Sequence, residues 1–175
     1  MLVTPHKSSG FTLIELMIGI TIFALTLSLG VSSFRTWIQN TQIRNAAESI
    51  QNGLQRARAE AVKRNTNVAF TLLGPDSSWA VSVVSGGEVV ESRNSSEGSK
   101  NVSAIGFDSG AVAATTITFN NFAGVVANAN TLSTVELDSS VLDPADSREL
   151  EVRINVGGNI KMCDPNLSAP NPMAC

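Results

Sequence analysis

The sequence predicts an α+β protein in which one long N-terminal helix packs on antiparallel β-sheets, with a C-terminal tail closed by a disulfide. Three observations support this fold class. Residues 11–64 contain no proline and carry apolar side chains at helical spacing. After Asn65 the pattern changes to short β-rich runs separated by turn residues. The two cysteines, Cys163 and Cys175, both lie at the end of the chain.

The beginning of the helix is apolar enough to suggest a membrane segment. Residues 11–31 would form a helix of roughly 31 Å, which matches the ~30 Å thickness of a bilayer core. One carboxylate, Glu15, lies inside this segment. A charge there costs on the order of 2.5–3.5 kcal/mol, so an acidic side chain within a membrane is a functional-site hypothesis by default.

The residues before the apolar segment suggest an unusual leader. Residues 1–10 are polar, contain Lys7, and end in Gly10. A secretory signal has its small-residue cleavage site after the apolar stretch. Here the small residue comes first, so cleavage would leave the helix on the product. The alternative is a plain membrane anchor in which Glu15 is incidental. Lys7 predicts a cytoplasmic N-terminus, with everything after Val31 beyond the membrane.

The second part of the helix, residues 32–64, is amphipathic. Its apolar positions recur at steps of three and four residues and form one stripe, as expected for a helix packed on its own head domain rather than a coiled coil. The stripe consists of Ile43, Ala46, Ala47, Ile50, Leu54, Ala57 and Ala61.

Residues 65–175 are expected to form the β-rich head. The residues between the expected strands are rich in Gly, Pro, Asn and Asp, which is turn chemistry. We expect residues 94–101 and 127–147, which are rich in Ser, Asn and Asp, to be loops. The expected strands are Val68–Leu73, Trp79–Val84, Val89–Arg93, Ile117–Phe122, Val125–Ala127, Leu150–Val156 and Asn159–Met162.

Charge and composition exclude several classes of function. Residues 11–64 hold six basic and three acidic residues, whereas residues 65–175 hold five basic and twelve acidic ones. An acidic head is not the pattern of a general nucleic-acid binder. The chain has one histidine, His6, which lies in the expected leader, and it lacks a G-x-S-x-G motif. We therefore expect no enzyme, no cofactor and no metal site.

The spacing of the cysteines favours a disulfide. A metal site needs more ligands than two cysteines, and a redox motif needs C-x-x-C. A Cys163–Cys175 bridge would close the proline-containing tail and place the head outside the reducing cytoplasm.

The segment G-F-T-L-I-E-L (Gly10–Leu16) resembles the signal of type IV prepilins and type II secretion pseudopilins. The resemblance implies a pilin-like fold and cleavage by a prepilin peptidase between Gly10 and Phe11. It also implies N-methylation of Phe11 and a role for Glu15 in assembly. Before assembly the protein would then reside in the bacterial inner membrane as a single-pass subunit with a periplasmic head. Other major and minor pilins would recruit it into a pilus by packing against its helix.

The helix R-N-A-A-E-S-I-Q-N-G-L-Q-R-A-R-A-E-A-V-K-R-N (Arg44–Asn65) is similar to that of the GspH/FimT group of minor pilins and pseudopilins. The segments I-T-F-N-N-F-A-G-V-V and G-G-N-I-K-M-C-D-P resemble the same group, and the cysteine tail favours its FimT branch. The resemblance implies a minor pilin for pilus biogenesis; the alternative is a GspH-like pseudopilin of type II secretion.

For FimT-like proteins the resemblance also implies binding of double-stranded DNA during natural transformation, through a G-R-x-R motif before the first tail cysteine. In this chain the two arginine positions are Asn159 and Lys161. Lysine is a point charge and asparagine is neutral, whereas arginine binds phosphate with two donors. Arg148 and Arg153 are further candidates, so any binding is expected to be weak.

Overall fold

A computed structural model of the chain describes residues 10–175, apart from the side chains of residues 28–32. The expected leader therefore lies outside the described residues except for Gly10. The chain divides into two compact units, Met1–Arg35 and Thr36–Cys175. The second unit, which we call the head, contains the second half of the helix and all the strands of the described chain.

The helix α1 extends over Leu13–Arg64, which is 52 residues, and confirms the long helix that the absence of proline predicts. Lys63 and Arg64 occupy its last turn, where cations interact favourably with the helix dipole. Asn65 follows with a φ of 51°, the left-handed conformation that commonly terminates a helix.

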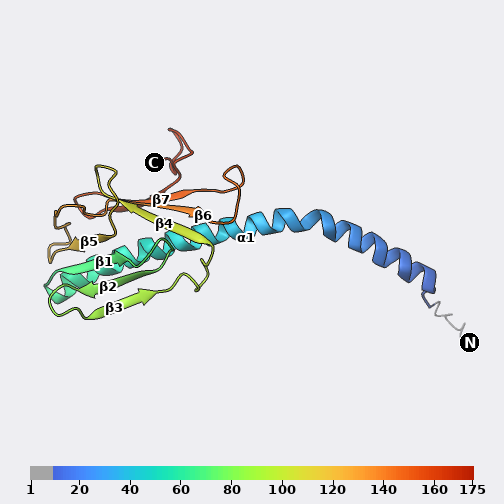
Figure 1. Cartoon of the computed structure of the whole chain (residues 1–175), viewed down its shortest axis with the longest axis horizontal. Helices are drawn as coiled ribbons and strands as arrows, with labels where there is room; N and C mark the ends of the chain where they lie inside the picture. Colours follow the sequence, from blue (N-terminus) through green and yellow to red (C-terminus); the bar gives the residue numbers. More distant parts are fainter. Residues whose placement is uncertain (1–9) are drawn as a thin grey trace, which may run out of the picture. The chain divides into compact units, whose positions relative to one another are not determined.

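Eight strands form two antiparallel four-stranded sheets in the described chain. Sheet A has the order β3-β2-β1-β5, and sheet B has the order β4-β6-β7-β8. Figure 1 shows that the second half of α1 runs alongside both sheets. The strands are β1 (Val68–Leu72), β2 (Trp79–Val83), β3 (Val89–Arg93), β4 (Val102–Phe107), β5 (Thr116–Phe119), β6 (Thr134–Ser139), β7 (Leu150–Ile154) and β8 (Ile160–Cys163).

The apolar stripe of α1 forms the core of the head together with the inner faces of both sheets. All seven stripe residues have no exposed surface, and they belong to one hydrophobic cluster with strand residues such as Phe70, Phe119 and Leu137. Trp79 is 2% exposed and donates a hydrogen bond from Nε1 to Ser49 Oγ at 2.9 Å. The expectation that the stripe from Ile43 to Ala61 packs on the head is therefore correct.

Some of the predictions for strands and loops are wrong. Residues 127–147 are not one loop, because β6 lies within them. Val135 and Leu137 are buried at alternate positions in β6, and their burial outweighs the low strand preference of the neighbouring Glu, Asp and Ser. Residues 125–127 form no strand, and only an isolated bridge joins Val125 to Phe119. The strand β4 was not expected either.

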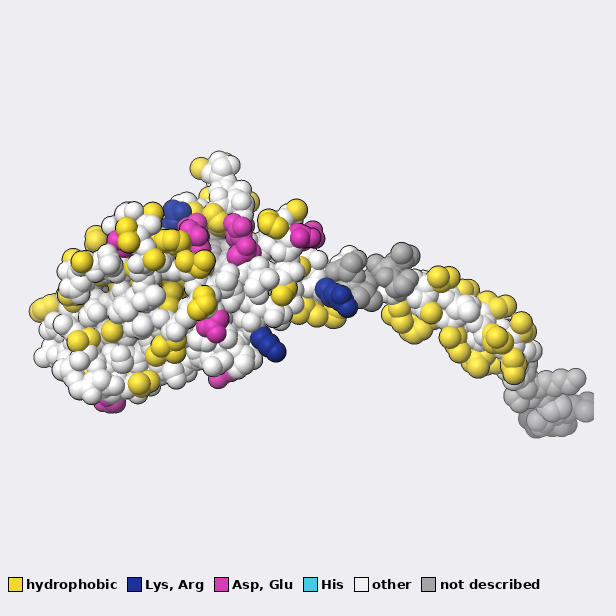
Figure 2. All heavy atoms as spheres, in the orientation of Figure 1, with side chains coloured by type: hydrophobic (Ala, Val, Ile, Leu, Met, Phe, Trp, Pro, Cys, Tyr) yellow, Lys and Arg dark blue, Asp and Glu magenta, His cyan; other side chains and the backbone are white. Residues whose placement is uncertain are grey.

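The expected membrane segment, residues 11–31, includes positions whose side chains are not described. Figure 2 shows hydrophobic side chains over the described part of the first unit, where large residues such as Phe11 and Leu25 are exposed. In the part of the chain that the structure describes, no helix is both long enough and apolar enough to cross a membrane. The membrane segment stays a prediction.

Amide side chains of α1 connect the beginning of the head part of the helix to two loops. Asn40 donates from Nδ2 to the Asp146 oxygen at 3.0 Å, and its Oδ1 accepts from the Arg148 N–H at 2.9 Å. Gln42 Oε1 accepts from the Asn101 N–H at 3.3 Å. Gln39 Oε1 accepts from Asn101 Nδ2 at the same distance. We call these contacts the amide clamp.

One carboxylate, Glu60, lies near the end of α1 with 2% of its surface exposed. Arg64 Nε lies 2.7 Å from Glu60 Oε2, and Lys63 and Arg56 approach within 3.3 and 3.4 Å. The hydrogen bond from Arg64 lowers the pKa of Glu60, although burial alone would raise it. Glu60 therefore stabilises the head above its ordinary pKa, and this stabilisation is lost as the pH falls through the lowered value.

Candidate functional site

The N-terminal candidate residues lie at the beginning of α1. The Thr12 N–H and the Thr12 hydroxyl each donate to Glu15 Oε2 at 2.8 Å, and the Glu15 N–H donates to Thr12 Oγ1 at 3.3 Å. This reciprocal arrangement is a capping box, which supplies partners for N–H groups that the first helical turn leaves free. Glu15 therefore has local partners within its own chain.

Glu15 was predicted as a site residue from the sequence, but its capping partner Thr12 was not. The signal was present, because T-L-I-E has the S/T-x-x-E spacing of a capping box before an apolar run. Gly10 and Phe11 precede the capped helix and are exposed, as a cleavage site would need to be. The same carboxylate can serve in capping and in assembly, because it can exchange its hydrogen bonds with Thr12 for bonds to another partner.

The expected disulfide is present. Cys163 and Cys175 are bridged, with their Cα atoms 5.0 Å apart. The Asp164 N–H also donates to the Met173 oxygen at 2.7 Å, so the two ends of the tail lie side by side. Glu151 lies within 4.8 Å of both sulfur atoms, but bridged cysteines offer no thiolate to a metal.

Three of the four candidate DNA-binding residues lie together. Arg153, Asn159 and Lys161 line a groove of about 330 Å³ on sheet B, and Arg153 and Lys161 are direct partners in the β7–β8 register. Both cations donate to main-chain oxygens of the C-terminal tail. Lys161 Nζ donates to the Ala174 oxygen at 2.8 Å, and Arg153 Nη1 donates to the Cys175 oxygen at 3.2 Å. We call this site the basic groove.

The fourth candidate, Arg148, lies elsewhere. It precedes β7, about 16 Å along the chain from Arg153 at ~3.3 Å per residue, and its N–H belongs to the amide clamp. Glu151 also opposes a basic site, because its Oε2 accepts from Arg153 Nε at 2.7 Å. The structure therefore brings together two cations, not three, and one of them is paired with a carboxylate.

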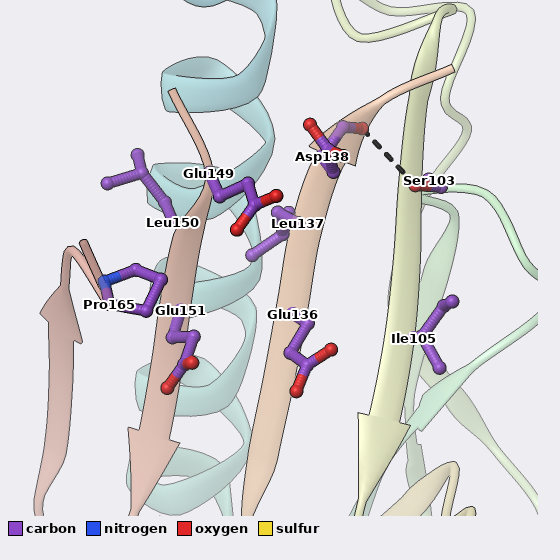
Figure 3. A pocket seen from close by; sticks show the side chains of 9 residues that line it. All are labelled: Ser103, Ile105, Glu136, Leu137, Asp138, Glu149, Leu150, Glu151 and Pro165. Atoms are coloured by element: carbon purple, nitrogen blue, oxygen red, sulfur yellow. Dashed lines mark hydrogen bonds between the residues drawn. The ribbon is translucent and has the colours of Figure 1, made fainter. Parts of the chain in front are cut away.

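A second surface of sheet B is acidic. Glu136, Glu149 and Glu151 line a cavity of about 310 Å³ with Asp138 and Pro165, and Figure 3 shows the three glutamate side chains on the same side of the sheet. Acidic side chains also gather over this part of the head in Figure 2. Glu136 is the direct cross-strand partner of Glu151. Burial raises the pKa of Glu136, and the charges of Glu151 and Glu149 raise it further.

We expect Glu136→Gln to stabilise the head at neutral pH by about 0.5 kcal/mol, because like charges directly opposite each other destabilise a sheet. Glu136 has a raised pKa in the folded protein, so its penalty is complete above that value. The penalty disappears as the pH falls through the raised value toward the ordinary one. The melting temperature of the variant should therefore be higher than that of the wild type at pH 7 and equal to it at acid pH.

The matched control for this prediction is Glu48→Gln. Glu48 Oε1 lies 2.9 Å from Arg44 Nε on the exposed surface of α1, so its loss should leave the melting temperature unchanged or slightly lower. A melting temperature of the Glu136→Gln variant equal to or below that of the wild type at pH 7 would show that the cross-strand repulsion is negligible.

The fold is similar to that of a solved minor pilin. A crystal structure of the type IV minor pilin FimU from Pseudomonas aeruginosa aligns with a TM-score of 0.52 at 18% identity, covering 77% of this chain and 98% of that one. A second crystal form of FimU has a TM-score of 0.49 at the same identity, covering 73% and 98%. Among curated proteins, no sequence matches the chain at a significant level.

Two family models match the sequence. The prokaryotic N-terminal methylation motif matches residues 5–31, and the family described as type II transport protein GspH matches residues 46–158, more than half of the chain. Pilins and pseudopilins of this kind are structural subunits and not enzymes. The pilin-like fold, the methylation motif and the sequence of the head agree, and the chain belongs to the GspH family.

Proposed function

We propose that this chain is a minor type IV pilin that is cleaved after Gly10, methylated on Phe11 and drawn from the inner membrane into a pilus. The observation that carries the proposal is the position of Glu15, whose carboxylate caps α1 directly after the expected cleavage site. After cleavage the new amine of Phe11 would lie at the beginning of this helix. The carboxylate of one subunit would then pair with the Phe11 amine of its neighbour.

Assembly would relieve the electrostatic cost of Glu15. A carboxylate in lipid is expensive, whereas a carboxylate and an ammonium paired in low dielectric attract each other strongly. The register of the incoming helix would be set by this pair. The match of the methylation motif to residues 5–31 supports membrane anchoring and processing by the prepilin peptidase.

Mass spectrometry of the mature protein tests the processing step. We expect Phe11 to be the first residue, with one added methyl group on its amine. A Gly10→Val variant, which removes the small residue at the cleavage site, should keep residues 1–10. A mature wild-type N-terminus after Val31 would contradict the proposal, because the helix would then have been discarded.

A role in DNA uptake is a further part of the proposal. The basic groove offers Lys161 and Arg153, and Asn159 occupies the position of the first arginine of the family motif. Because the groove lies next to acidic side chains and its cations contact the tail, we expect weak binding without sequence preference.

Asn159→Arg tests this role. In the full chain in detergent, we expect the variant to bind duplex DNA about tenfold more tightly at low salt, because a guanidinium adds a bidentate phosphate contact. The slope of log K against log salt should steepen by about 0.9 for one added contact. The control is Asn52→Arg, on the exposed surface of α1, which adds the same charge away from the groove. Equal affinities of the two variants would exclude the groove as a DNA site.

A second candidate function is that of a type II secretion pseudopilin, which the description of the matching family favours. Both machines use the same N-terminal chemistry, so the processing test does not separate them. Deletion of the gene separates the two functions when surface pili, protein secretion and DNA uptake are each measured. A loss of secretion with normal pili would favour the pseudopilin.

A further inference from the structure

A third cavity lies where the two sheets meet at the end of the head that contains the end of α1. Its volume is about 230 Å³, smaller than the ~300–1,000 Å³ pockets that hold drug-sized ligands. The bottom of the cavity consists of apolar residues from different elements. Ile117 of β5, Leu132 before β6 and Ile154 of β7 are buried core residues. Val125 and Val156 lie over them and keep exposed side-chain surface. We call this cavity the seam pocket. It is separate from the N-terminal site and adjoins the basic groove, with which it shares Ser133, Ile154 and Asn155.

The edge of the seam pocket carries polar groups with unused hydrogen-bonding capacity. Asp108 Oδ1 accepts from the N–H groups of Gly110 and Val112 at 2.8 and 2.9 Å. Asn155 Oδ1 accepts from the Asn159 N–H at 3.0 Å. In the described part of the chain, neither Asp108 Oδ2 nor Asn155 Nδ2 has a hydrogen-bond partner. Each loop is therefore held by one side-chain oxygen, and the second polar atom of that side chain stays available to a ligand.

The chemistry of the lining selects one kind of occupant. Beyond Asp108 and Asn155, the lining contains two further amides, Asn128 and Asn130, and no Lys, Arg or His. An apolar side chain would leave the carboxylate and amides without partners, which is unfavourable on burial. An anion would be repelled by Asp108. A neutral ring with one apolar face and several hydroxyl groups satisfies both the apolar bottom and the polar edge.

We propose that the seam pocket binds a single neutral sugar residue of a glycan. The C–H face of the ring would contact Val125 and Val156, and its hydroxyl groups would donate to Asp108 Oδ2 and accept from Asn155 Nδ2. This site goes beyond a role in assembly, because it is made from head residues and uses none of the N-terminal residues.

Nuclear magnetic resonance titration of the isotope-labelled full chain tests the proposal. The chain is kept in a zwitterionic detergent without a sugar headgroup, and glucose, galactose and N-acetylglucosamine are added separately. For a ligand of this size we expect a Kd on the order of 1–10 mM for at least one sugar. The resonances of the side-chain amide of Asn155 and of the methyl groups of Val125 and Val156 should shift. The absence of shifts at about ten times this concentration would overturn the proposal.

Two nearly isosteric variants separate binding from folding. Asp108→Asn and Asn155→Asp both keep the oxygen that holds the loop and change only the available atom. We expect Asp108→Asn to weaken binding about tenfold, because it replaces a charged acceptor with a donor. The control is Asn120→Asp. Asn120 Oδ1 holds a neighbouring turn outside the pocket, so the affinity of this variant for the sugar should be unchanged. An equal loss of sugar affinity in all three variants would contradict the proposal.

Cyclohexanemethanol, an apolar probe of similar size, tests the alternative that the pocket holds a hydrophobic side chain instead of a sugar. If this compound shifts the pocket resonances and none of the sugars does, the pocket accepts a hydrophobic side chain of a neighbouring protein and the carbohydrate proposal is wrong.

Discussion

Replacing Glu15 by glutamine is expected to leave the subunit in the inner membrane and to remove it from filaments. Glutamine preserves the capping geometry with Thr12, because either Glu or Gln can occupy that position of a capping box. The substitution removes only the charge. Loss of one partner from a buried charge pair costs on the order of 2–5 kcal/mol, so incorporation should fall at least tenfold. Quantitative mass spectrometry of sheared filaments and of membranes measures both populations.

Thr12→Val is the matched variant. It removes the hydroxyl that donates to Glu15 Oε2 and keeps the carboxylate. If the charge directs assembly, Thr12→Val subunits should enter filaments nearly as well as the wild type. If helix capping is what matters, Thr12→Val should fail and Glu15→Gln should succeed. The second result would exclude the proposed pairing with the Phe11 amine.

Gly106→Ala is expected to destabilise the head by about 3 kcal/mol, at the upper end of the usual cost of overpacking. A Cβ atom at Gly106 would collide with the main-chain oxygen of Ala114 and lie 2.5 Å from Leu132 Cδ1. The Ala114 N–H donates to the Gly106 oxygen at 2.9 Å, so the clash would also separate β4 from the segment leading to β5. In a protein of this size the melting temperature should fall by roughly 6–12 °C.

Gly110→Ala is the control for this clash. The nearest atom to a Cβ at Gly110 is Asp108 Oδ1 at 3.4 Å, which is ordinary contact. Its melting temperature should stay within a degree or two of the wild type by the same scaling. If Gly106→Ala melts at the temperature of Gly110→Ala, the close approach of the 113–115 segment does not contribute to stability.

The elements with a strong local pattern were predictable, and the others depended on distant partners. The stripe from Ile43 to Ala61 predicts a helix and its buried face without knowledge of the sheets. By contrast, β6 contains Glu136 and Asp138, and only its pairing with β4 and β7 makes it a strand. The order of the strands within the two sheets was also beyond reach, because no local signal specifies which strands pair.

The candidate sites divide in the same way. The Cys163–Cys175 bridge could be found from sequence, because both cysteines lie at the end of the chain. Glu15 stands out in a similar way, as a carboxylate in an apolar segment, and its role in assembly stays a prediction. The sequence could not show that Lys161 and Arg153 contact the tail oxygens, since those contacts depend on how the tail folds back. It also gave no reason to connect Asp108 with Asn155, which lie 47 positions apart in sequence and line the same cavity.

The amide clamp has a mechanical consequence. In a filament built from this subunit, tension would travel along α1 and enter the head where the helix first contacts its loops. Gln39, Asn40 and Gln42 lie within about one helical turn, so their bonds to Asn101 and to the 146–148 loop share the load instead of breaking one after another. Resistance to force depends on the rate of unfolding rather than on equilibrium stability. Two polar surface loops would then serve as the attachment that keeps the head on the helix while the filament is under tension.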